Sequence, residues 1–125
     1  MAKVTGIGGV FFKSEDPEKL YAWYEKYLGI TRQNGYVAFL WQDDGKPVDD
    51  GMTTWSLFPK HTGYFAPSTA PFMINYRVDD LDGILAAIAA DGLEASLKRE
   101  DSEYGKFAWI SDPEGNRIEL WEPPK

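Results

Sequence analysis

The chain carries the same structural pattern twice, at an offset of 63 or 64 residues, and this repeat restricts the possible folds more than any other feature. Each copy begins with an apolar strand, VTGIGGVFF at 4–12 and PFMINYRV at 71–78, followed by an amphipathic helix and further strands. The duplication therefore predicts two similar modules. The matched positions are Asp16 with Asp80, Gly29 with Gly92, and TTWSLF (53–58) with RIELWE (117–122).

Apolar residues at helical spacing define the two helices. Asp16, followed by Pro17, is suited to start the first helix, and Asp79 or Asp80 the second; glycines end both. The periodic residues are Leu20, Trp23, Tyr24, Tyr27 and Leu28 in the first helix, and Leu81, Ile84, Leu85 and Ile88 in the second. Further strands are expected at about 36–42, 53–58, 94–98, 105–111 and 117–122, with the turn-rich DDGKPVDDG joining the first two.

Module size indicates how the two halves must be arranged. The modules span about 1–58 and 72–125, and the Pro- and Gly-containing segment 59–71 reads as a linker between them. About sixty residues with one helix bury too little apolar surface to be secure, so the two sheets are expected to pair. We predict one α+β domain over 1–125, in which two βαβββ modules form a curved mixed sheet, an incomplete barrel, around a cup. Whether the modules pair within one chain or between two chains stays open.

The charge balance limits the possible partners. Thirteen Lys and Arg residues against twenty Asp and Glu residues give a net charge of −7. This charge argues against nucleic acid and anionic membranes as partners. It favours a cationic or neutral small ligand, but solubility alone explains the same charge. The chain has no cysteine, so disulfides and thiolate metal sites are excluded. The first residues lack the apolar run of a signal peptide, and no stretch reaches the length of a membrane span, so a cytoplasmic protein is expected.

Three motifs, in order along nearly the whole chain, resemble the vicinal oxygen chelate superfamily of glyoxalase I, bleomycin-resistance proteins and extradiol dioxygenases. They are GVFFKSEDPEKLYAWYEKYLG (9–29), NYRVDDLDGIL (75–85) and FAWISDPEGNRIELWEP (107–123). The third, an Asp-Pro turn followed by an apolar–Glu–apolar strand, is the most specific. The resemblance implies the incomplete barrel of paired βαβββ modules, and it also implies a homodimer.

The resemblance also implies metal ligands at up to four symmetric positions, on the first and last strands of each module. In this chain those positions fall at Gly9, Ser56, about Met73, and Glu119, so only Glu119 keeps an expected ligand type. The single histidine, His61, lies in the linker, and the aspartates at 43, 44, 49 and 50 lack the ligand spacing of a calcium loop. We therefore expect no cofactor; a divalent metal is disfavoured, and if one binds, Glu119 is its ligand.

Strand alternation predicts which side chains face the cup. If Glu119 faces inward, its strand-mates Arg117 and Trp121 do too, and Phe107 and Trp109 share one face of their strand, inner or outer. Glu119 is the candidate catalytic residue, as a general base or an anchor for a cation; alternatively, Arg77 and Arg117 neutralise it in a structural salt bridge. The candidate ligand-binding residues are Phe11, Ser56, Met73, Asn75, Arg77, Trp109, Arg117 and Trp121.

Three function classes remain. The first, which we favour, is a metal-free module that binds a small organic ligand in its cup, as the resemblance to bleomycin-resistance proteins implies. The second is an enzyme: a metal-dependent lyase, isomerase or dioxygenase with a non-standard ligand set, or a metal-free acid–base enzyme. The third is a structural or interaction domain without a small ligand.

Overall fold

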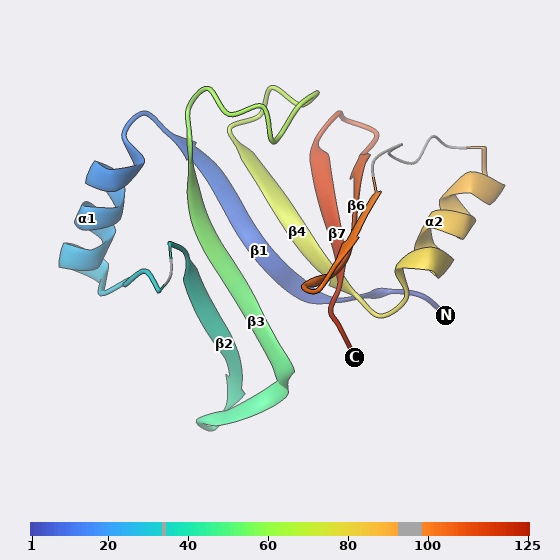
Figure 1. Ribbon diagram of the computed structural model, residues 1–125, viewed down its shortest axis with the longest axis horizontal. Coiled ribbons are helices and arrows are strands. Elements are labelled where there is room, and N and C mark those ends of the chain that lie inside the picture. Colours follow the sequence, from blue (N-terminus) through green and yellow to red (C-terminus); the bar gives the residue numbers. More distant parts are fainter. Residues whose placement is uncertain (34, 93–98) are drawn as a thin grey trace.

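The two copies of the repeat form one open, seven-stranded mixed sheet, shown in the computed structural model of Figure 1. The structure describes residues 1–33, 35–92 and 99–125. The strand order is β2–β3–β1–β4–β7–β6–β5, so the first module supplies one half of the sheet and the second module the other. The elements are β1 (Val4–Ser14), α1 (Pro17–Leu28), β2 (Val37–Asp43), β3 (Lys46–Pro59), β4 (Phe72–Val78), α2 (Leu81–Ala90), β5 (Arg99–Ser102), β6 (Gly105–Ser111) and β7 (Arg117–Glu122).

Strand register confirms the duplication. The opening strands of the modules, β1 and β4, pair antiparallel at the centre of the sheet, and each has the last strand of its own module, β3 or β7, as a parallel neighbour. Phe11 lies opposite Ser56, and the equivalent pair in the second module is Asn75 opposite Glu119. The α+β fold of two modules in a curved, unclosed sheet is therefore confirmed, and the two modules pair within one chain.

The helices cover the outer face, one beside each half of the sheet (Figure 1). Asp16 caps α1 through the Lys19 N–H, and Gly29 ends it with a left-handed φ of 68°. The Tyr21 hydroxyl anchors α1 by accepting a hydrogen bond of 2.8 Å from the Leu57 backbone N–H. Beneath α2, a core of Val78, Leu81, Ala108 and Leu120 is almost fully buried.

Three segments differ from the sequence prediction or escape it. Strand β3 begins at Lys46, whereas the sequence placed a turn-rich connection over 43–51; only Asp44 and Gly45 form the turn, both with positive φ. Strand β5 (Arg99–Ser102) pairs with β6. Its charged sequence, REDS, lacks an apolar pattern, so no strand was predicted at these residues. The strand predicted at 94–98 lies outside the described residues.

The predicted linker, 59–71, contributes to the core. Phe65 is 0% exposed and packs with Met73 and Trp109 on the inner face of the sheet. Two turns hold it there: the Ala66 N–H donates to the Gly63 carbonyl, and the Ser68 N–H donates to the Phe65 carbonyl. The segment therefore closes one end of the cup rather than only joining two modules.

No helix among the described residues combines the length and the apolar character needed to span a membrane.

Candidate functional site

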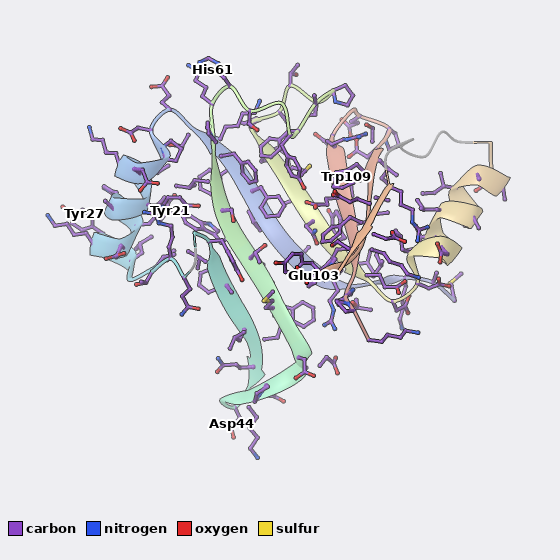
Figure 2. The ribbon with its side chains drawn as sticks, viewed as in Figure 1. Tyr21, Tyr27, Asp44, His61, Glu103 and Trp109 are labelled. Carbon is purple, nitrogen blue, oxygen red and sulfur yellow. The ribbon has the colours of Figure 1, made fainter. Side chains whose placement is uncertain are left out.

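A pocket of about 360 Å³ opens on the inner face of the sheet, and both modules contribute to it. Strands β1 and β3 of the first module and β4, β6 and β7 of the second carry most of its walls, together with the β5–β6 turn and the segment after β7. The lining residues are Gly8, Phe11, Met52, Thr54, Asn75, Glu103, Tyr104, Phe107, Glu119, Trp121 and Pro124. Glu103, labelled in Figure 2, lies at the β5–β6 turn, away from His61 on the loop after β3.

Glu119 lies at the buried end of this pocket. Its side chain is 3% exposed, and its Oε1 accepts a hydrogen bond of 2.9 Å from the Tyr64 hydroxyl. Asn75, opposite it on β4, is 4% exposed. Neither Glu119 Oε2 nor Asn75 Oδ1 has a hydrogen-bond partner within the described residues. A buried acceptor left without a donor costs about 1–3 kcal/mol, so the site carries two such costs side by side.

Burial shifts the pKa values of Glu119 and of its hydrogen-bond donor Tyr64. Removal from water raises the pKa of the Glu119 carboxyl above its usual value, while the Tyr64 hydroxyl and the nearby Asn75 side chain act in the opposite direction. Burial and the adjacent Glu119 carboxylate also raise the pKa of the Tyr64 hydroxyl well above its usual range. Tyr64 therefore stays protonated at any physiological pH and acts as the fixed donor of the pair.

Replacing Tyr64 with phenylalanine is expected to raise the pKa of Glu119 further, because the mutation removes a hydrogen bond that stabilises the carboxylate. Side-chain carboxyl ¹³C NMR over a pH series measures the change. Tyr27→Phe is the matched control: Tyr27 is 60% exposed on α1, so its replacement should leave the pKa of Glu119 unchanged. An unchanged or lowered pKa in Tyr64→Phe would show that the hydroxyl does not serve as a donor to Glu119.

The walls of the pocket are aromatic. The Phe107 and Trp121 rings lie nearly parallel, with centroids 6.3 Å apart and planes 17° apart, and Phe11 adds a third ring from β1. The Trp121 indole N–H donates to the Tyr104 carbonyl at 2.8 Å, which fixes the orientation of that ring. Gly8 leaves the space open, because a Cβ there would collide with Asn75 Oδ1 and lie 3.1 Å from the Trp121 ring.

The structure brings some of the sequence-predicted site residues together and separates others. Phe11, Asn75, Glu119 and Trp121 line the pocket, whereas Ser56, Met73, Arg77, Trp109 and Arg117 do not. Met73 and Trp109 lie in the core beneath Phe65, 0% and 3% exposed. The register settles the open question about β6: Trp109 lies opposite Glu119 and Phe107 opposite Trp121, so both face inward.

The proposed salt bridge to Glu119 is absent. Across residues 1–33, 35–92 and 99–125, no ion pair joins Glu119 to an arginine. Arg77 instead donates to the Asp49 carbonyl at 3.2 Å and lies 5.1 Å from the Trp41 ring. Arg117 is half-buried, and burial lowers its pKa. The alternative in which Arg77 and Arg117 neutralise Glu119 is therefore wrong.

Several site residues were missed from sequence. Thr54 lies within the predicted strand 53–58 and shares a face with Ser56, but it was not named as a candidate site residue. Met52 lies one residue before that predicted strand, at a position that alternation assigns to the same face once the strand is extended. Tyr64 gave a weaker signal, an aromatic residue within a segment otherwise rich in turn-forming residues. Glu103 and Tyr104 belong to a hairpin turn, and strand patterns do not predict the direction of turn side chains.

The donor set does not fit the metal site that the fold family implies. The register places Ser56 and Glu119 at equivalent positions, and Gly9 is equivalent to Met73. Of these four residues only Glu119 offers an anionic oxygen, and a glycine offers no side-chain ligand. Within the described part of the chain, no group of three or more His, Asp or Glu side chains is placed to hold an ion, and His61 is exposed.

Comparison with known proteins agrees with this architecture. The chain belongs to the Glyoxalase/Bleomycin resistance protein/Dioxygenase superfamily, whose family model matches residues 6–120. The match covers both modules and ends within β7, directly after Glu119. Among the curated proteins, none matches the chain.

Solved structures show the same fold at low sequence identity. A methylmalonyl-CoA epimerase from Mycobacterium tuberculosis is 20% identical, with a TM-score of 0.62 over 98% of this chain and 90% of that one. A variant of the Streptomyces coelicolor methylmalonyl-CoA epimerase, in complex with 2-nitronate-propionyl-CoA, is 16% identical, with a TM-score of 0.68 over 98% and 100%. A superfamily member from Vibrio splendidus 12B01 is 14% identical, with a TM-score of 0.58 over 98% and 99%.

Proposed function

We propose that this protein binds a small organic molecule in the pocket on the inner face of its sheet, without the metal centre of its family. The observation that carries this proposal is the combination of an open, aromatic-walled pocket with a buried carboxylate and amide at its end. Mostly apolar walls with a few convergent polar groups are typical of small-molecule sites. The metal-dependent alternative is weaker, because three of the four equivalent ligand positions hold glycine, serine and methionine.

A ligand screen tests the proposal. ¹⁵N HSQC spectra of the full chain are recorded with a set of one- and two-ring aromatic compounds that includes cations, neutral molecules and anions. We expect at least one compound to shift the resonances of Gly8, Asn75, Glu119 and the Trp121 indole together. If no compound affects these resonances, or if shifts gather only at α1, the proposed function is wrong.

Two glycine variants sharpen the screen. Gly8→Ala places a methyl group against Asn75 and the Trp121 ring, so the bound compound is expected to bind about tenfold more weakly or not at all. Gly63→Ala is the matched control, because a Cβ at Gly63 has no heavy atom within 4 Å. Equal binding by both variants would place the ligand outside the pocket.

Divalent metal is expected to leave the stability of the protein unchanged. A site filled at a thousandfold excess over its dissociation constant adds about 4 kcal/mol, which thermal melting of untagged protein in millimolar Mn²⁺, Ni²⁺, Co²⁺ or Zn²⁺ would detect. EDTA should likewise have no effect, and the melting temperature of Glu119→Gln, whatever its value, should be equally insensitive to metal and to EDTA. One metal ion per chain in elemental analysis, lost in Glu119→Gln, would contradict the proposal and restore the metal-dependent alternative.

We also propose that the protein forms a homodimer in the cytoplasm, as its family resemblance implies. Large apolar side chains on α1 and β2 support an interface, since Trp23, Tyr27 and Leu40 are 50%, 60% and 63% exposed. Light scattering over a concentration series is expected to give twice the chain mass. A monomer at every concentration would contradict the dimer.

A further inference from the structure

Two hydrogen-bond acceptors are unsatisfied at the buried end of the pocket. Glu119 Oε2 and Asn75 Oδ1 are without partners in the described residues, and both side chains are more than nine-tenths buried. They come from neighbouring strands paired in register, which lie about 4.8 Å apart. Buried acceptors are almost always satisfied by some donor. A single group with two donors would satisfy both oxygens at once.

Three donors near the pocket are bonded to other acceptors. The Tyr64 hydroxyl is bonded to the other Glu119 oxygen, Oε1, at 2.9 Å. The Trp121 indole N–H is bonded to the Tyr104 carbonyl, and the Thr54 hydroxyl donates to the Gly8 carbonyl at 3.2 Å. No ion pair among the described residues joins Glu119 to a lysine or arginine. Among the lining residues that the structure describes, an anionic ligand would meet these two acceptor oxygens and no lysine or arginine.

The lining residues favour a particular ligand shape as well as a particular ligand charge. The nearly parallel Phe107 and Trp121 rings, together with Phe11, give the pocket aromatic walls that suit a planar group. Aromatic faces also attract cations. Glu103 adds a second carboxylate to the lining. Both charged side chains among the described lining residues, Glu103 and Glu119, are therefore acidic.

From this arrangement we infer that the ligand carries a planar, protonated nitrogen group, such as an amidinium or an amino-heterocycle, which donates to Glu119 Oε2 and Asn75 Oδ1. The inference rests on the proposed function and adds the chemical class of the ligand. The competing arrangement needs no ligand: a protonated Glu119 donates from its own Oε2 to Asn75 Oδ1. The two arrangements predict different ligand preferences, because only the first requires the ligand to carry hydrogen-bond donors.

Benzamidine and benzoate test the inference, because their ions have nearly the same shape but opposite hydrogen-bonding roles. Benzamidinium is a cation that donates hydrogen bonds, and benzoate is an anion that accepts them. ¹⁵N HSQC titrations of the full chain at pH 7 give the dissociation constants. Benzamidinium is expected to bind at least about tenfold more tightly than benzoate, because it can donate charge-assisted hydrogen bonds to both acceptors, whereas benzoate has no donor and carries the same charge as the Glu119 carboxylate. Its shifts should include the Asn75 side-chain amide and the Glu119 backbone.

Variants of Glu119 and Asn75 test whether these two residues bind benzamidinium. Glu119→Gln removes the charge and Asn75→Ala removes the second acceptor, and each is expected to weaken benzamidinium binding by about tenfold or more. Asn75→Ala keeps the test valid if Glu119→Gln proves poorly folded. Glu114→Gln, at an exposed carboxylate in the β6–β7 turn, is the matched control and should bind as the parent does.

The outcomes separate this inference from the proposed function. If neutral or anionic aromatics shift the pocket resonances as strongly as benzamidinium does, the cup binds ligands but the donor requirement is wrong. If benzamidinium binds equally well to the parent, Glu119→Gln and Asn75→Ala, the donor requirement is wrong as well. If neither probe nor any compound of the wider screen reaches the pocket, both proposals fall together.

Discussion

Replacing Phe65 with alanine is expected to lower the free energy of unfolding by about 3–5 kcal/mol, the usual cost of removing a buried phenylalanine ring. The Phe65 side chain is 0% exposed, and it packs on Met73 and Trp109, with the Phe58 ring centroid 5.2 Å away. Because the segment 59–71 contains few other buried side chains, its position over the sheet depends largely on this ring. Urea unfolding followed by tryptophan fluorescence measures the loss.

Phe39→Ala is the matched control for this prediction. Phe39 is 46% exposed on the edge strand β2, so its removal should cost about 1 kcal/mol or less. A Phe65→Ala cost as small as that of Phe39→Ala would show that 59–71 is a linker, as the sequence suggested, and not part of the core. The same variant should also alter the pocket, because Tyr64, next in the chain, is the donor to Glu119.

The repeat made the fold predictable. Strand and helix periodicities are local, and two copies of the same order at one offset left few ways of burying the apolar faces. The register agrees closely with that offset: Val10 lies opposite Ile74, 64 residues on, so the repeats meet about a point of local symmetry between β1 and β4. The pairing of both modules within one chain required the structure, because either arrangement buries the same faces.

Segments without periodicity were harder to predict. Strand β3 runs through Lys46, Pro47 and the aspartates at 49 and 50, residues typical of turns, because pairing with β2 satisfies its backbone and the positive φ of both aspartates absorbs the irregularity. Phe65 is buried by long-range packing against β4 and β6, and a local pattern carries no signal of such contacts. Tertiary contacts outweighed local preference at both places.

Strand alternation predicted the face of each site residue but not its depth. Met73, Asn75 and Arg77 share the inner face of β4, as expected, yet only Asn75 lines the pocket. Met73 is covered by Phe65, and Arg77 turns toward Asp49 and the Trp41 ring. What lies above each inner-face residue decides its role, and that cover comes from parts of the chain that alternation does not describe.

Glu119→Gln is expected to raise the free energy of unfolding at neutral pH and to remove a pH dependence that the parent shows. Burial raises the pKa of Glu119 in the folded protein above the value of 4.5 expected when the chain is unfolded. As pH rises through 4.5, the unfolded state loses this proton first, so parent stability falls by up to about 1.4 kcal/mol per pH unit until the folded pKa is passed. Glutamine cannot ionise, and its side-chain oxygen can still accept from Tyr64.

The stability advantage of Glu119→Gln should therefore be small near pH 4, grow as pH rises, and reach a plateau above the folded pKa. Urea unfolding at intervals between pH 4 and pH 8 measures it for the parent and the variant. Glu114→Gln is the control: because its carboxylate is exposed, its stability should follow the parent at every pH. A parent that gains stability over Glu119→Gln as pH rises would mean that Glu119 is stabilised as a carboxylate in the folded state. The arrangement in which Glu119 Oε2 has no donor or cation beside it among the described residues would then be wrong, because such stabilisation requires a positive charge or further donors beside Oε2.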